Sequence, residues 1–433
     1  MCTLFKIMLK LSCMSTNIKQ IYAAMELCES EIRILVGEYY NTRFNIIRAD
    51  KYNTNAISDF KIVNKEELIS DIRYAVGKTS EKIGSDLEQV LLVLPAYNFK
   101  RFPLRSKVVI DSGIVKKQDI ARAISNSLRS KVDSDVMVVS PMIVKYTING
   151  ISTRRLPENE MCSEVIVDID LLCADTEVCY DYVSVIEASG IKVLDIVLNT
   201  YAVAKEAALF EESLNRSIIV LDINRCCTYL SLLSKGKLVS TEIVFDGLNS
   251  LINKVYRTYN MPYNDIAKLV KYSINYDSEY PDDIIYAWTS QGTTNTITTK
   301  MLNETVAKPL DLLSDKLVTM CKPIIETGAS IIITSEGEQM KALSDVIRQK
   351  AQCEVKTYYP DTIGVRDPAF TALYGTFFVY RDKVIMNNLD VSCIDLLKYD
   401  SLIDQKKLDS EGETITTKIK NLFRQYMEKG GNQ

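Results

Sequence analysis

Hydrophobic residues along this chain gather in short runs, and two of these runs are joined so closely that they predict a β-hairpin. Residues 218–223 form an apolar run in which Asp222 is the one charged residue, and residues 228–234 form a second strand-like run. Residues 224–227 separate the two runs, a length that suits a hairpin turn. A Lys-Gly-Lys turn at residues 235–237 ends the second strand.

A similar pattern opens the chain. Residues 18–38 predict two strands around a turn at residues 28–30, and residues 44–47 add a third strand. In the second strand, apolar residues at positions 32, 34 and 36 alternate with Glu31 and Arg33. This period of two indicates a β-strand.

The following segments alternate helix and strand. Apolar residues at helical spacing predict a helix over residues 65–83, and an uninterrupted apolar run predicts a buried strand that ends at Pro95. Such runs suit the central sheet of an α/β domain. From Tyr97 the pattern changes and predicts a strand-rich subdomain, with strands at residues 107–110, 137–146 and 164–172 and helices at residues 117–129 and 178–189.

Composition describes an ordinary globular protein. The 433 residues suffice for two or more domains with substantial cores, and 47% of them are hydrophobic and 25% charged. A net charge of −4 provides no basic field, so we expect no nucleic-acid partner. The 11 cysteines include no Cys-x-x-Cys pair, which indicates reduced, mostly buried thiols in a cytosolic protein. No uncharged apolar run reaches the ~18 residues of a membrane-spanning helix.

The chain contains no histidine. This absence excludes Ser-His and Cys-His nucleophile pairs, histidine-ligated zinc and imidazole acid–base chemistry. We therefore expect no catalytic residue and no metal site. Residues 1–17 are apolar but interrupted by Lys6 and Lys10, and we interpret them as a disordered lead or a mis-assigned start. Met14 is then the natural first residue in place of Met1, and a signal peptide is the alternative.

The hairpin at residues 222–228 resembles the second phosphate hairpin of the actin-like ATPase superfamily. That superfamily has Asp-Ile-Gly-Gly-Gly-Thr-Thr, whereas this chain has Asp-Ile-Asn-Arg-Cys-Cys-Thr. Its first phosphate loop resembles residues 26–31, here Glu-Leu-Cys-Glu-Ser-Glu, and its third motif resembles residues 334–337, here Thr-Ser-Glu-Gly. A Gly-Gly pair of the superfamily is Asp246-Gly247 here, and the closing Asp-Pro before an Ala-rich helix is Asp367-Pro368. The resemblance covers residues 18–380.

The inserted subdomain is similar to that of FtsA, the actin-like protein of bacterial division. Residues 116–123 stand at the helix start of that insert, and residues 149–151 stand at its Asp-Gly loop. The resemblance implies an α/β, actin-like (ribonuclease-H-like) two-lobed fold with an FtsA-type inserted subdomain in the first lobe. The implied parts are the first lobe at residues 18–96 and 193–215, the insert at 97–192, the second lobe at 216–381 with an outer helical subdomain at about 255–320, a flexible linker at 382–413 and a membrane-targeting helix at 414–429.

The phosphate loops have lost most of their glycines. Cys28 replaces a turn glycine, Glu29 and Glu31 add negative charge where phosphates would lie, and Arg225 and Cys226 add side chains. We expect ATP binding to be weakened or lost and hydrolysis to be absent, which makes the protein a non-hydrolysing scaffold. If ATP with magnesium still binds weakly, the resemblance implies a loose pocket formed by Glu26, Ser30, Asp222, Asn224, Thr228, Gly247 and Gly337.

The last residues predict a terminal amphipathic helix. Its basic residues Lys418, Lys420 and Arg424 lie away from one apolar face, a pattern that suits an anionic membrane surface. The alternative is a helix that docks on its own core. The apolar face consists of Ile415, Ile419, Leu422, Phe423, Tyr426 and Met427.

The FtsA resemblance implies a division adaptor at the cytoplasmic face of the cell membrane. Such a protein anchors the ring protein FtsZ through the FtsZ C-terminal peptide, self-associates into actin-like filaments, and contacts other division proteins through the insert. Two alternatives remain. One is an ATP-binding actin-like ATPase or sugar kinase, and the other is a pilus-assembly actin-like protein, which needs no membrane helix of its own.

Overall fold

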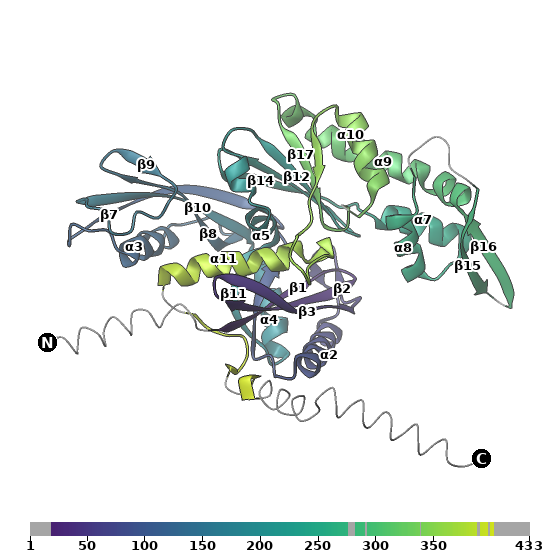
Figure 1. Cartoon of the computed structure of the whole chain (residues 1–433), viewed down its shortest axis with the longest axis horizontal. Helices are drawn as coiled ribbons and strands as arrows, with labels where there is room; N and C mark the ends of the chain where they lie inside the picture. Colours follow the sequence, from purple (N-terminus) through teal and green to yellow (C-terminus); the bar gives the residue numbers. More distant parts are fainter. Residues whose placement is uncertain are drawn as a thin grey trace, which may run out of the picture.

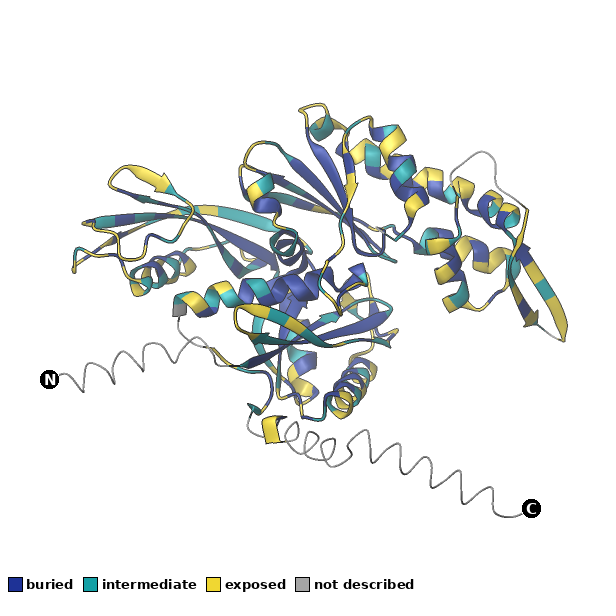
Figure 2. Ribbon diagram, in the orientation of Figure 1, coloured by how far each residue is buried: buried dark blue, intermediate teal, exposed yellow. Residues whose placement is uncertain are grey.

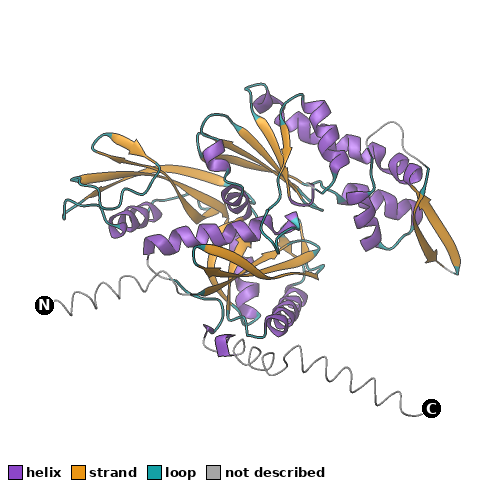
Figure 3. Cartoon of the chain, in the orientation of Figure 1, coloured by secondary structure: helices purple, strands orange, loops and turns teal. Residues whose placement is uncertain are grey.

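The fold is described from a computed structural model of the whole chain. It covers residues 19–275, 282–290, 292–337, 339–387, 390–396 and 399–401. These residues form two lobes, and a strand-rich body is attached to the first lobe (Figure 1, Figure 3).

The first lobe is a five-stranded sheet with helices on both faces. The two helices α2 (Lys65–Ile83) and α4 (Thr176–Ala188) lie below it in Figure 1, and α5 (Asn199–Glu206) and α11 (Thr371–Asn387) lie above it. A short pair, β4 (Ile57–Ser58) and β5 (Lys61–Ile62), accompanies the sheet. The strand order is β11 (Lys192–Leu198), β6 (Gln89–Leu94), β1 (Gln20–Leu27), β2 (Glu31–Tyr40) and β3 (Arg43–Asn53).

The second lobe repeats this topology. In each lobe three consecutive strands pair antiparallel, and two later strands then add in parallel beside the first of the three. The predicted hairpin of residues 218–234 is confirmed. The strand order is β14 (Lys237–Val244), β13 (Thr228–Ser234), β12 (Ile218–Ile223), β17 (Ser330–Thr334) and β18 (Val355–Thr357).

Helices and a small sheet extend the second lobe outward. The outer subdomain predicted at about residues 255–320 is helix-rich with a polar interruption, and in that interruption the structure has a two-stranded sheet of β15 (Ile284–Ser290) and β16 (Thr293–Thr298). Thr298 caps the long helix that follows, because its side chain accepts a hydrogen bond from the Met301 amide. The helices are α7 (Asn249–Tyr259), α8 (Tyr263–Tyr272), α9 (Thr299–Ile325) and α10 (Lys341–Ala351), and α6 (Leu209–Glu212) links the lobes.

The inserted body has its own sheet and core. The alternating residues Val165, Val167 and Ile169 are fully buried, and Ile120 from α3 (Lys117–Leu128) belongs to the same cluster. The predicted insert reached residue 192, but α4 packs with the first lobe instead, because its apolar face joins that lobe's core. The strand order is β7 (Lys100–Val109), β10 (Glu164–Asp175), β8 (Val136–Ile148) and β9 (Ile151–Thr153).

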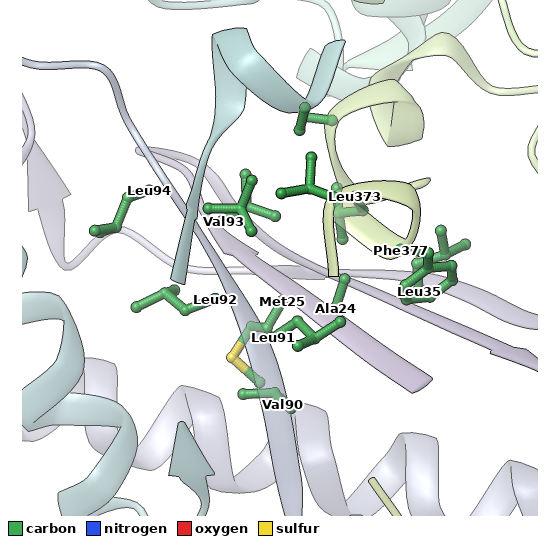
Figure 4. Packing of buried hydrophobic residues seen from close by; sticks show 14 of the residues in the cluster. Ala24, Met25, Leu35, Val90, Leu91, Leu92, Val93, Leu94, Leu373 and Phe377 are labelled. Atoms are coloured by element: carbon green, nitrogen blue, oxygen red, sulfur yellow. The ribbon is translucent and has the colours of Figure 1, made fainter. Parts of the chain in front are cut away.

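Helices on both faces explain why the central strands are apolar throughout. In β6 the residues from Val90 to Leu94 are at most 1% exposed. Figure 2 shows buried residues running through the sheets of both lobes. Leu373 and Phe377 of α11 pack on one side of this sheet, near Ala24 of β1 (Figure 4). At the start of β2, Glu31 and Arg33 are only 5% and 3% exposed despite their alternation with apolar residues, because this end of the strand lies against the second lobe. Two charged side chains therefore lie inside the protein.

The end of the described chain differs from the predicted linker. Helix α11 continues to Asn387, past the expected linker start at residue 382. Beyond it Cys393 is fully buried, and its amide donates a hydrogen bond of 2.7 Å to the carbonyl of Ile21. This segment docks on the first lobe because its apolar residues cover the start of β1. The predicted lead at residues 1–17 lies outside the described residues.

Helices α5 and α11 approach so closely at Gly375 that we expect a side chain there to be destabilising. A Cβ atom at Gly375 would lie 2.0 Å from the carbonyl oxygen of Ala202, whereas a Cβ atom at Gly77 in α2 would meet nothing within 4 Å. Gly375→Ala should lower the free energy of unfolding by about 1–3 kcal/mol through overpacking. Gly77→Ala, the matched control, should raise it by about 0.5–1 kcal/mol because it removes the glycine from a helix interior. Urea denaturation measures both changes, and equal effects of the two substitutions would contradict the packing argument.

Candidate functional site

The carboxyl ends of equivalent strands in the two lobes face each other across a cleft. The β1–β2 turn at residues 28–30 belongs to the first lobe, and the β12–β13 turn at residues 224–227 belongs to the second. The short 3-10 helix η2 (Ser335–Gly337) follows β17 in the second lobe. Crevices at the carboxyl ends of strands are where open α/β sheets bind ligands. These three segments are the predicted phosphate motifs.

A buried guanidinium fills the centre of this cleft. Arg33 lies directly opposite Glu26 in the β1–β2 pair, and its Nη1 approaches Glu26 Oε2 at 3.2 Å. Arg33 Nε donates to Glu31 Oε1 at 2.6 Å, and Nη2 approaches Glu336 Oε1 at 3.3 Å. Nη1 also donates to Asn224 Oδ1 at 3.4 Å. One side chain of the first lobe therefore contacts two segments of the second.

The same guanidinium contacts the segment that returns to the first lobe. Arg33 Nη1 donates to the carbonyl oxygen of Ala369 at 3.1 Å, within the 3-10 helix η3 (Pro368–Phe370). Nearby, Lys51 of β3 pairs with Asp367 at 2.7 Å. Arg33 thus holds the start of α11 as well as the two turns.

Glu336 is the carboxylate at the other end of this network. It is fully buried and pairs with Lys271 of α8, and its Oε2 accepts from Arg225 Nε at 3.2 Å. Burial by itself would raise the pKa of Glu336, but the charges of Lys271, Arg33 and Arg225 outweigh it and lower the pKa to about 2. Glu336 is therefore ionised at neutral pH.

Glu26 behaves in the opposite way. Burial raises the pKa of Glu26 to about 7, because the attraction of Arg33 is opposed by the neighbouring charges of Asp222 and Glu31. Arg33 carries one positive charge for three carboxylates, and Glu31 and Glu336 compensate most of it. Glu26 is the carboxylate that the network leaves least compensated.

The remaining space in the cleft is small. A cavity of about 50 Å³ lies between the turns, bordered by Glu26, Cys28 and Ser30 from one lobe and by Asn224 and Cys227 from the other. Such a volume holds a few water molecules. Pockets for drug-sized ligands and cofactors occupy roughly 300–1,000 Å³. The cavity between the turns is several times smaller than such pockets.

The structure brings together some of the residues predicted for a loose ATP pocket and separates others. Glu26, Ser30 and Asn224 border the cavity. Asp222 is buried behind the turn, where its Oδ1 accepts from Asn224 Nδ2 at 3.2 Å. Thr228 is fully buried, and its hydroxyl donates to the Asp246 carbonyl at 3.0 Å instead of facing the cavity.

The two predicted glycines serve packing. A Cβ atom at Gly247 would lie 2.2 Å from the Asn224 carbonyl oxygen, and one at Gly337 would lie 2.6 Å from Ile223. Each glycine allows a close approach to the β12–β13 hairpin of its own lobe. Ser335, where the superfamily has glycine, adopts the left-handed region at φ 57°. The glycine-like backbone is thus kept there without the glycine.

Arg33, Glu336 and Lys271 are central residues that the sequence analysis did not place in the site. A hairpin that turns at residues 28–30 pairs residue 26 with residue 33. The hairpin register therefore indicates from the sequence that Arg33 lies beside Glu26. Glu336 lies in the third motif, whose expected ligand contacts come from glycines. Nothing in the local pattern indicated Lys271, because α8 reaches the cleft through tertiary packing alone.

A larger cavity lies away from this cleft. It measures about 690 Å³ and lies between the inserted body, α5 and α11. Four of its charged side chains form two ion pairs, Lys383 with Asp195 at 2.7 Å and Lys205 with Asp382 at 2.6 Å. The chemistry suggested by the sequence motifs is concentrated at the smaller cavity.

Two lobes of the same topology, with three turns converging on the cleft between them, define a protein of the actin-like fold. The solved structure of the PilM-PilN type IV pilus biogenesis complex has this architecture, with a TM-score of 0.55 over 83% of this chain and 98% of that one. The two are 12% identical, so the likeness concerns the fold alone. No protein-family model matches the chain.

Sequence comparison identifies the particular relatives. The chain is 20% identical to the cell division protein FtsA of Enterococcus hirae, over 94% of this chain and 99% of that protein. It is 21% identical to FtsA of Bacillus subtilis (strain 168), over 82% of each chain. The chain is thus similar to FtsA proteins over most of its length, as its motifs predicted.

The predicted membrane-binding residues, from Ile415 to Met427, lie outside the described residues. Within the described ranges, no helix has both the length and the apolar character needed to cross a bilayer.

The raised pKa of Glu26 predicts a pH dependence of stability. The folded protein holds a proton that the unfolded chain loses near pH 4.5, so stability should fall as pH rises from about 4.5 to 7. Glu26→Gln removes this titration and preserves the shape. Between about pH 4.5 and 7, the free energy of unfolding of wild type should therefore fall by up to about 3 kcal/mol relative to that of the variant. Chemical denaturation at each pH measures it. Glu81→Gln, at an exposed position, is the control, and a constant difference between wild type and Glu26→Gln would refute the assignment.

Proposed function

We propose that this protein is a division adaptor of the FtsA type, which links the FtsZ ring to the cytoplasmic face of the cell membrane and self-associates into actin-like filaments. Similarity to FtsA proteins over most of the chain supports the role in division. The actin-like fold supports self-association. The remaining parts of the role come from the sequence pattern and the family resemblance.

We also propose that nucleotide binding is weakened or lost and that ATP is not hydrolysed. The observation that carries this proposal is the ion-pair network of Arg33 and Glu336, which occupies the cleft and leaves a cavity of about 50 Å³. Phosphate loops bind anions through backbone N–H groups that approach closely. Here Glu29 borders the cavity at the first turn, and the guanidinium groups of Arg33 and Arg225, which could otherwise attract phosphate, are paired with the buried, ionised Glu336. The protein then acts as a scaffold instead of an ATPase.

The tether we assign is the amphipathic segment at residues 414–429. Its apolar face would enter the headgroup region, while Lys418, Lys420 and Arg424 would contact anionic lipids. A single helix of this kind binds reversibly, and self-association would add avidity. This places the protein peripherally on the membrane at the division site.

Partners follow from the same resemblance. We assign the FtsZ C-terminal peptide to the outer part of the second lobe and other division proteins to the inserted body. The pilus-assembly alternative has structural support only at the level of the fold, because the PilM likeness is 12% identical. The sequence relatives favour division.

Titration calorimetry with ATP and magnesium tests the proposed loss of nucleotide binding. We expect no heat of binding up to millimolar ATP for the full chain, because a ligand would have to displace buried ion pairs that are costly to leave uncompensated. An actin-like protein that is known to bind ATP, titrated under the same conditions, serves as the positive control. Micromolar binding would show that the cleft opens readily and would restore the ATPase alternative.

Flotation with vesicles containing anionic lipid tests the tether. Leu422→Glu places a charge on the apolar face and should weaken binding by about tenfold or more, since burying a leucine contributes ~1.5–3 kcal/mol. Asn421→Glu adds the same charge to the opposite face and is the matched control, for which we expect a change below about threefold. Equal losses would mean that charge alone governs binding, and no loss with Leu422→Glu would favour a helix docked on its own core.

A further inference from the structure

The pair of Arg33 and Glu336 joins side chains that belong to different lobes and lie 303 residues apart. Each partner is also held within its own lobe. Glu26 and Glu31 contact Arg33 in the first lobe, while Lys271 and Arg225 contact Glu336 in the second. Both charges are therefore positioned before they meet, which reduces the ordering cost of the contact.

The geometry of Arg33 suits a side chain that bridges the two lobes. Its guanidinium group contacts Glu336 at 3.3 Å and Asn224 at 3.4 Å, so it reaches both η2 and the β12–β13 turn. The planar guanidinium makes several directed hydrogen bonds at once, which a lysine cannot do. The pair is almost entirely screened from water, because Arg33 is 3% exposed and Glu336 is fully buried.

An apolar contact closes the cleft beside this pair. Phe60 of the first lobe packs against Tyr229 and Phe245 of the second, with ring centroids 6.1 and 5.9 Å apart. Cys227 belongs to the same cluster, together with Ala96 of the first lobe, and is 7% exposed. Cys227 is thus covered by the opposite lobe, and its thiol reports whether the lobes are closed.

Two-lobed proteins commonly close around a ligand that contacts both lobes. We propose that Arg33 replaces such a ligand, so that its pair with Glu336, the latch, holds the lobes closed when no nucleotide is present. The inference rests on the proposed function in taking closure to be independent of ATP. A chain that is closed at all times presents one fixed surface for self-association, and its assembly then depends on concentration and on the membrane instead of on hydrolysis.

Thiol labelling of the full chain tests the latch. N-ethylmaleimide is added to the native protein, and the modification rate of each cysteine is followed by peptide mass spectrometry. Cys227 reports the cleft, whereas Cys321 and Cys393, which are fully buried in other parts of the structure, report global unfolding. A local opening and a loss of fold are therefore distinguished within one sample.

Glu336→Gln removes the charge and keeps the shape. We expect Cys227 to react about thirtyfold faster or more, the factor that corresponds to losing ~2 kcal/mol from a buried charge pair, while Cys321 and Cys393 keep their wild-type rates. Lys271→Gln is the matched control, because it removes a partner of the same carboxylate within one lobe. We expect Cys227 to stay protected in that variant.

Several outcomes would overturn the latch. One is a wild-type rate at Cys227 in Glu336→Gln, and another is equal acceleration of all three thiols, which would mean that the pair stabilises the fold and not closure. Equal acceleration of Cys227 by Lys271→Gln would also refute it. If Glu336→Gln does not fold, Arg33→Lys is used instead, because it keeps the charge and loses the planar guanidinium. It should still raise the modification rate of Cys227 selectively.

The two proposals fail separately. Calorimetric binding of ATP to wild type would refute the loss of nucleotide binding whatever the labelling shows. An unchanged Cys227 rate in both Glu336→Gln and Arg33→Lys would refute the latch even if ATP does not bind.

Discussion

A guanidinium buried between two lobes needs hydrogen-bond acceptors on every side, because an uncompensated charge in a protein interior is unfavourable by several kcal/mol. Arg33 meets this requirement with Glu26 and Glu31 from its own sheet, Glu336 and Asn224 from the second lobe, and the Ala369 carbonyl before α11. The positions of both turns, of η2 and of α11 are therefore coupled to one side chain. The small volume of the cavity follows from the same constraint.

The rest of the molecule retains the architecture of an actin-like protein without its glycine-rich loops. The backbone at Ser335 is left-handed although the residue is not glycine, and Gly247 is kept where it packs against Asn224. The fold is thus kept while the residues of the loops differ, as expected when function depends on the residues that a fold carries. Ion pairs between protein groups lie at the turns that resemble the phosphate loops of the superfamily.

Much of the fold followed from local patterns. The helix at residues 65–83, the strand before Pro95 and the hairpin at residues 218–234 have the predicted bounds or lie within one residue of them. Assignments that depended on packing between distant segments were less accurate. Helix α4 joined the first lobe instead of the insert, and the segment around Cys393 docked on β1 although its mixed polarity suggested a linker. Neither contact leaves a local signal.

The sequence by itself determined the strand and helix order, the degenerate phosphate motifs and the relationship to FtsA, because periodicity and short motifs are properties of neighbouring residues. It also placed Glu26 and Asn224 at the cleft. Only the tertiary structure decided that Arg33 is buried and meets Glu336, a residue 303 positions away. Alternation in β2 made Arg33 look half-exposed, but the second lobe and η3 bury it. Burial and long-range charge pairing depend on how whole elements stack, and no local pattern records this.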